Sequence, residues 1–147
     1  MKVFFDSSAF VKRFMEEDGS REVDAYCEQA TLLGLGVICI PEIMSALNRK
    51  VRERVLSKED YQRIKRQIVN DIEDAQIIQL TPEVLERSVR LLEQHALRSL
   101  DALHIACALE WRADVFVSSD KRQLQASRDF GLDCRNPASR MVKVPMN

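Results

Sequence analysis

Short apolar runs alternate along this chain with longer segments in which apolar residues recur every three or four positions. The short runs predict buried β-strands at residues 2–5, 35–40, 76–80 and 114–118, with 132–135 as a further edge strand. The longer segments predict helices between the strands. Because buried strands that alternate with helices are joined by right-handed crossovers, the pattern predicts a three-layer α/β fold, a mostly parallel small sheet flanked by helices.

Local signals predict where the helices begin. Ser7 or Ser8 is expected to cap a first helix after strand 2–5. Pro41 is expected to end strand 35–40, and Glu42 to open a helix whose apolar stripe continues through Val55. The other predicted helices cover residues 20–30, 57–74, 81–95 and 99–112, and a last one ends near residue 131.

The composition is that of one soluble globular domain covering residues 1–147. The chain is 46% hydrophobic and 31% charged, with only four glycines and four prolines, which excludes a disordered protein. The apolar run at 32–41 is about half of the ~20 residues that a membrane-spanning helix needs, and the first apolar residues are too few for a secretion signal. We therefore expect a cytoplasmic protein with no membrane span. Its four cysteines form no CxxC pair and are expected to be reduced, mostly buried packing residues.

Positive charge gathers in one part of the chain, although the net charge is only −1. Residues 49–66 contain eight lysines and arginines against three acids, a local balance of 8 − 3 = +5. This segment predicts a basic face for an anionic partner. The alternative is a solvated pair of helices without a partner, because charge runs are common on exposed helices.

Four acidic residues occupy unusual places in the apolar pattern. Asp6 and Asp120 end apolar runs, Glu42 follows one, and Asp101 interrupts an apolar helical pattern. Ligands of open parallel sheets bind beyond the carboxyl ends of the strands, where Asp6, Glu42 and Asp120 are expected. Asp101 joins them if the first turn of its helix also points there. Carboxylates brought together at an apolar site repel each other unless they bind a hard cation, so we predict a Mg²⁺ or Mn²⁺ site.

Each acid also has a simpler interpretation. Asp6 and Asp120 could only cap the helices that follow them, and Glu42 could only favour a helix start. Asp101 is harder to explain in this way, since aspartate is a poor helix former and its neighbours are apolar.

Three further residues are predicted to support the acids. Ser8 and Ser118, each two residues from an aspartate, are placed to hold a carboxylate or a metal-bound water, or else serve as cap and turn residues. His104 lies one helical turn beyond Asp101 and is placed to orient that carboxylate or to meet a phosphate. A lone histidine on an apolar helix is, however, more often structural.

Four short motifs together resemble the PIN-domain family, and most closely its VapC-type toxins. They are VFFDSSA at 3–9, PE at 41–42, LDALHIA at 100–106 and FVSSD at 116–120. The resemblance runs from residue 1 to about 137. It implies a PIN-like fold and places the family's four acids on Asp6, Glu42, Asp101 and Asp120, which hold Mg²⁺ or Mn²⁺ and cleave RNA. It also implies a homodimer and a small VapB-type antitoxin partner.

The resulting hypothesis is a divalent-metal-dependent endoribonuclease, the toxin of a VapBC-type toxin–antitoxin system. Arg49, Lys121 and Arg122 are the candidates for neutralising the RNA backbone. One alternative is a PIN-like module that binds RNA or protein without cleaving. Another is a phosphate-signalling receiver domain, which needs paired acids after the first strand, whereas serines follow Asp6 here.

Overall fold

The computed structural model describes residues 1–138, and the last part of the predicted 1–147 domain, residues 139–147, lies outside the described residues. All strand pairs of its sheet are parallel, and the strand order is β3-β2-β1-β4-β5. The strands are β1 (Lys2–Phe5), β2 (Leu32–Gly36), β3 (Gln76–Ile78), β4 (Val115–Val117) and β5 (Cys134–Arg135). The predicted edge strand is therefore confirmed as β5, in shorter form.

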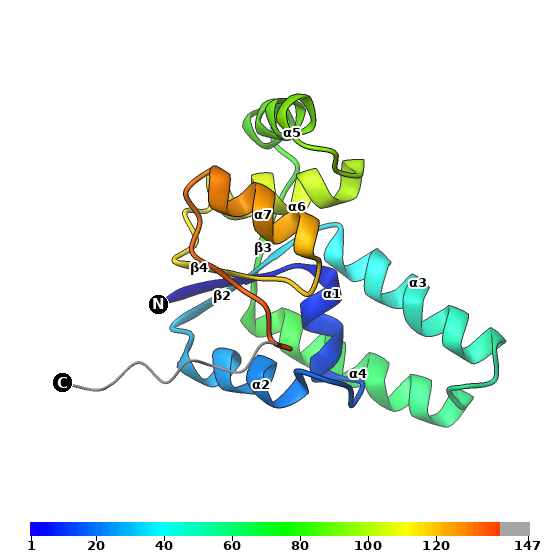
Figure 1. Cartoon of the computed structure of the whole chain (residues 1–147). Coiled ribbons are helices and arrows are strands. Elements are labelled where there is room, and N and C mark those ends of the chain that lie inside the picture. Colours follow the sequence, from blue (N-terminus) through cyan, green and yellow to red (C-terminus); the bar gives the residue numbers. More distant parts are fainter. Residues whose placement is uncertain (139–147) are drawn as a thin grey trace.

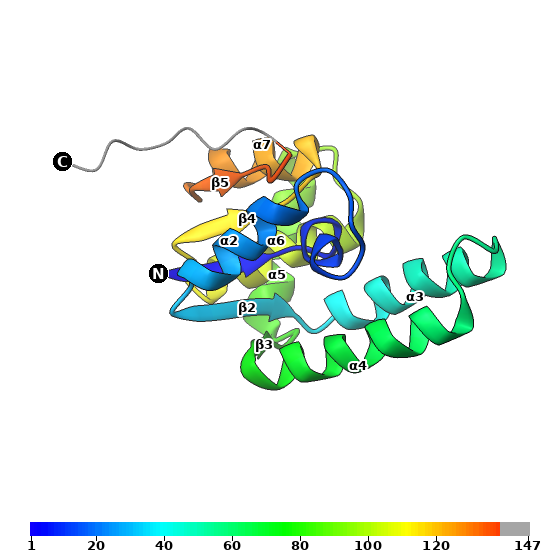
Figure 2. The ribbon, with the colours of Figure 1, turned by 90° about the horizontal axis from the view of Figure 1, so that it is seen from below.

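Helices cover both faces of this sheet (Figure 1). Those that pack on one face are α1 (Ser7–Phe10), the 3-10 helix η1 (Val11–Arg13), α2 (Ser20–Gln29), α3 (Cys39–Arg52) and α4 (Lys58–Asp74). Those on the other face are α5 (Pro82–Gln94), α6 (Ser99–Glu110) and α7 (Lys121–Asp129). Figure 2 shows that α3 and α4 extend together beyond the sheet as a helical hairpin. The predicted three-layer α/β fold is confirmed.

The central strand β1 divides the apolar interior into two cores. Val3 and Phe5 point into the core beneath α1 to α4, whereas Phe4 points into the core beneath α5, α6 and α7. All three side chains are fully buried, as alternation along a strand between two helical layers requires. On the second face Phe4 stacks on Phe116 of β4, with ring centroids 5.9 Å apart.

The second strand differs from its prediction. Strand β2 ends at Gly36, and residues 39 and 40 already belong to α3. The glycines that interrupt the apolar run are part of the strand: a Cβ on Gly34 would lie 2.7 Å from the ring of Trp111, so only glycine fits beneath that ring. Pro41 does not end a strand either. It lies in the first turn of α3, where the missing backbone N–H costs no helical hydrogen bond.

Two helix limits also differ from prediction. The first helix is capped by Asp6 itself, whose side chain accepts a hydrogen bond from the N–H of Ala9, instead of by Ser7 or Ser8. The helix predicted to continue through Val55 ends at Arg52, because Arg54 adopts a positive φ of 59° and turns the chain toward α4. Val55 is 67% exposed and does not extend the stripe. The helix starts capped by Ser57 and Thr81 are confirmed.

The cysteines are free and mostly buried, as predicted. Burial raises the pKa of Cys39 and of Cys107 to about 12, so both thiols stay protonated at neutral pH. Within residues 1–138, no helix has the length and apolar character that crossing a membrane requires.

Candidate active site

One cavity of about 370 Å³ is lined by all four predicted acids. Asp6 follows β1, Glu42 lies in the first turn of α3 after β2, and Asp120 caps α7 after β4. Asp101 lies in the first turn of α6 and faces the same cavity. Side chains that are up to 114 positions apart in the sequence therefore meet at the carboxyl end of the sheet, as the topology of parallel strands favours. We call this space the acid cavity.

Asp6 is the most enclosed of the four, with 1% of its surface exposed. Ser8 donates hydrogen bonds to both carboxylate oxygens, at 2.8 and 2.9 Å, and Ser118 donates one to Oδ2 at 2.7 Å. The N–H of Ala9 is a further donor at 3.0 Å. Burial raises the pKa of Asp6 above its usual value, although these donors and the nearby His104 lower it in part. An enclosed carboxylate with this raised pKa gains from a bound cation.

Glu42 is held by two side chains from other elements. The hydroxyl of Ser7 donates to its Oε1 at 2.8 Å, and Nε2 of the buried His104 contacts the same oxygen. Partial burial acts to raise the pKa of Glu42, but the contacts with His104 and Ser7 hold this pKa below its usual value. His104 thus orients Glu42, whereas sequence analysis placed it beside Asp101. Among the described residues no group hydrogen-bonds Nδ1 of His104.

The remaining two acids share Gln123 of α7. Its side-chain amide donates to Asp101 at 2.9 Å, and its backbone N–H lies 3.4 Å from the carboxylate of Asp120. Burial, followed by the charge of Asp120, raises the pKa of Asp101, so these two carboxylates are close enough to repel each other. Sequence analysis did not identify Gln123 or Ser7. The signal for Gln123 was its position three residues after a capping aspartate, which resembles a capping box.

The acid cavity fits a hydrated divalent ion better than a dehydrated one. In the part of the chain that the structure describes, no three His, Cys, Asp or Glu side chains are already gathered as ligands of one ion. Each carboxylate instead accepts hydrogen bonds from its own neighbours. Magnesium usually keeps several of its waters and binds through one or two carboxylates, so a cavity lined by four carboxylates provides the oxygen ligands that it requires.

Basic side chains reach the acid cavity from two elements. Arg49 of α3 and Arg98, at the N-cap of α6, both line it. Arg98 was not identified from the sequence, where no pattern marks it. Lys121 and Arg122 are exposed at the start of α7 and do not line this cavity.

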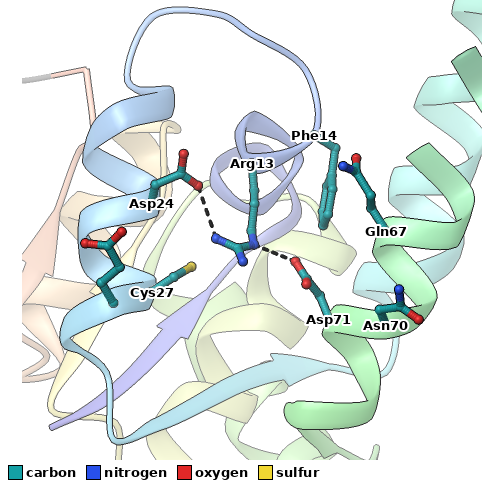
Figure 3. A pocket seen from close by; sticks show the side chains of 8 residues that line it. Arg13, Phe14, Asp24, Cys27, Gln67, Asn70 and Asp71 are labelled. Carbon is teal, nitrogen blue, oxygen red and sulfur yellow. Dashed lines mark hydrogen bonds and ion pairs between the residues drawn. The ribbon is translucent and has the colours of Figure 1, made fainter. Parts of the chain in front are cut away.

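A larger cavity of about 500 Å³ lies between α2 and α4 and is lined by none of the four acids. Figure 3 shows Arg13 at its centre, directed between Asp24 and Asp71. Arg13 donates to both carboxylates, at 3.1 Å in the case of Asp24. Since its guanidinium group already pairs with two acids across the helices, it connects α2 to α4.

Comparison with known proteins identifies the family. Residues 3–129 match the family model that describes the PIN domain. The chain belongs to the PIN-domain family. This membership is not compatible with the receiver-domain alternative, and nucleases of the PIN family generally depend on divalent metal ions.

Individual PIN-domain proteins agree with this assignment. Ribonuclease VapC45 of Mycobacterium tuberculosis (strain CDC 1551 / Oshkosh) is 31% identical over 107 residues, which are 73% of this chain and 74% of that protein. The crystal structure of VapBC2 from Rickettsia felis bound to a promoter DNA fragment has a TM-score of 0.68 at 14% identity, with 92% of this chain and 98% of the other covered. Mycobacterium tuberculosis VapC20, named as a sarcin-ricin loop cleaving toxin, has a TM-score of 0.66 at 12% identity and coverages of 88% and 95%. The two structural likenesses show that the PIN fold is shared.

Proposed function

We propose that this PIN-domain protein is a divalent-metal-dependent endoribonuclease that hydrolyses RNA phosphodiester bonds and is the toxin of a VapBC-type toxin–antitoxin system. The observation that carries the proposal is the meeting of four carboxylates in one cavity with two arginines at its edge. The name of its relative, Ribonuclease VapC45, supports the same activity. The names of VapBC2 and VapC20 support the toxin assignment.

The four acids are the proposed ligands of Mg²⁺ or Mn²⁺, directly or through water. A bound ion supplies an activated water and stabilises charge on the scissile phosphate. Ser8 and Ser118 fix both oxygens of Asp6 through hydrogen bonds, so this carboxylate has one orientation toward the cavity.

The remaining residues orient Glu42 and attract the substrate. Ser7 and His104 fix Glu42 from the other side of the acid cavity. Arg49 and Arg98 neutralise the RNA backbone at the edge of the cavity, and Lys121 and Arg122 stay candidates for a phosphate farther from it.

A homodimer and a small VapB-type antitoxin are the proposed protein partners. The name of the VapBC2 structure supports an antitoxin. An outward apolar stripe on α5, formed by Leu85, Val89 and Leu92, supports a partner of some kind, because monomers rarely expose such rows of large apolar side chains. Sedimentation of the purified chain, alone and with a co-expressed antitoxin, tests both partners.

Cleavage of a mixed RNA pool tests the enzymatic proposal. We expect cleavage with Mn²⁺ or Mg²⁺, none with excess chelator, and a loss of at least about a hundredfold in Asp6→Asn and Asp101→Asn, because each removes a charge from the cation site. Asp18→Asn changes an exposed acid outside the acid cavity and serves as the matched control. If the parent and Asp101→Asn cleave at equal rates, the mechanism is wrong. If the pure parent binds RNA but never cleaves it, the non-cleaving module is the correct alternative.

A further inference from the structure

A second cavity, of about 540 Å³, continues from the acid cavity along α3. The two cavities share Glu42, Ala46 and Arg49, so they form one continuous concave surface. We call the second cavity the α3 groove. Its far end is Arg52, and Leu100 of α6 lines it from the other side. A substrate bound at the acids can therefore continue along α3 within the α3 groove.

The α3 groove and the adjoining acid cavity carry arginines that are free to bind anions. Arg49 and Arg52 are three residues apart, so they lie on neighbouring positions of one helix face. Arg98 provides a third guanidinium group at the acid end. Among residues 1–138, none of these three arginines forms an ion pair with a carboxylate. Their position at the edge of an acidic site, without carboxylate partners, favours phosphate groups as ligands.

The α3 groove also has apolar lining residues. Ile38 and Pro41 line it from the start of α3, and Leu100 is 44% exposed there. Nucleotide bases present flat faces that pack on apolar side chains, and the backbone of the same strand presents phosphates. The α3 groove offers side chains for both kinds of contact. Among residues 1–138 no aromatic side chain lines it, so a base would contact aliphatic side chains there instead of stacking on a ring.

We propose that the α3 groove binds the RNA single strand on one side of the scissile phosphate, with Arg49 and Arg52 on backbone phosphates and Leu100 against a base. The inference rests on the proposed nuclease function and adds the path of its substrate. An RNA strand fits better than a protein segment because, among the described residues, the charged groups of the α3 groove are all cationic except Glu42, which belongs to the acid cavity.

Binding measurements separate this inference from the catalytic proposal. A short fluorescein-labelled single-stranded RNA of mixed sequence is titrated with the full chain carrying Asp101→Asn, and anisotropy is read at several salt concentrations. Adding Arg49→Ala and Arg52→Ala is expected to weaken binding by about tenfold or more and to reduce the slope of log affinity against log salt by roughly two. Adding Leu100→Ser is expected to weaken binding without changing that slope.

Arg21→Ala with Arg128→Ala removes two exposed arginines that line neither cavity and should leave the affinity nearly unchanged. If the Arg49/Arg52 variant binds RNA like its parent, the α3 groove is not the RNA path, and this face is assigned to a protein partner. The RNA path is also wrong if the control variant loses as much affinity as the Arg49/Arg52 variant. Circular dichroism verifies that each variant is folded. If the parent never cleaves RNA but binding still depends on Arg49 and Arg52, the α3 groove is an RNA-binding surface and the nuclease proposal falls.

Discussion

The hydroxyl of Ser118 donates a hydrogen bond of 2.7 Å to Oδ2 of Asp6, 112 residues away in the sequence. The hydroxyl oxygen of Ser118 in turn accepts a hydrogen bond from the backbone N–H of Asp120 at 3.0 Å. One buried serine at the end of β4 therefore links the acid that follows β1 to the acid that caps α7. The position of two candidate metal ligands relative to each other depends on this hydroxyl.

Replacing Ser118 by alanine should weaken both stability and metal binding. Asp6 loses a donor inside the protein, which costs about 1–3 kcal/mol of unfolding free energy, measured by urea denaturation. Mn²⁺ affinity, measured by calorimetry, should fall by about 10- to 100-fold, as is typical when a group that orients a ligand is removed. Ser88→Ala removes a buried hydroxyl from α5, outside the acid cavity, and should leave Mn²⁺ affinity unchanged. Equal Mn²⁺ affinities in Ser118→Ala and the parent would contradict this prediction.

Asp6→Asn should stabilise the metal-free protein at neutral pH. Burial raises the folded-state pKa of Asp6 above that of the unfolded chain, so the folded protein binds this proton more tightly. Stability therefore falls as the pH rises from the usual carboxyl pKa through the raised one, and it stays lower above that range. Asparagine has no charge to desolvate and is an equally good helix cap.

Thermal unfolding in chelator, followed across the acidic and neutral range, measures this difference. The Tm of the parent should fall with rising pH relative to that of Asp6→Asn. Added Mn²⁺ should raise the Tm of the parent more than that of the variant. A variant that is less stable than the parent in chelator at neutral pH would show that the hydrogen bonds of Asp6 outweigh its desolvation.

Much of this arrangement was predictable because it follows from local patterns. Short apolar runs that end at Asp6 and Asp120 indicated that acids lie at the carboxyl ends of parallel strands. Asp101 was conspicuous as an acid within an apolar helix. The predicted bounds of the second strand were wrong because the apolar residues continue past Gly36 into α3. Only the ring of Trp111, 77 residues after Gly34, shows why a glycine stands at that position of the strand.

The residues that orient the acids were less predictable. His104 and Glu42 are 62 positions apart, and their contact depends on how α6 packs against the start of α3. Ser7 and Gln123 were equally hard to predict, since each donates a hydrogen bond to an acid on another element. Spacing along one helix suggested Asp101 as the neighbour of His104, but packing between helices determines the actual partner.

Gly34→Ala should destabilise the sheet by about 1–3 kcal/mol, because the new methyl group would overlap the ring of Trp111 at 2.7 Å. Denaturant unfolding gives the size of the effect, and a second substitution, Trp111→Leu, should relieve part of it in a double-mutant cycle. Gly36→Ala is the matched control, since its nearest atoms lie 3.6 Å away and leave room for a Cβ. A larger loss in Gly36→Ala than in Gly34→Ala would contradict the packing argument.

Arg13→Met should lower stability by about 1 kcal/mol or less, since the guanidinium group joins α2 to α4 but its side chain is one-third exposed and screened by solvent. The loss should shrink at high salt, which screens exposed charges in the parent. Arg63→Met breaks one exposed pair within α4 and should change stability less. Urea denaturation at low and high salt measures both variants, and a loss that does not depend on salt would indicate lost packing instead of lost charge.

The central place of β1 in the sheet has a consequence for biosynthesis. This strand and its neighbour β2 are made well before its other neighbour, β4, which begins only at residue 115. Until then the backbone N–H of Asp6 lacks its acceptor, the carbonyl of Val117. A nascent chain therefore cannot complete the acid cavity before β4 and the start of α7 have been made. We expect RNA cleavage by this protein to begin only after that point in its synthesis.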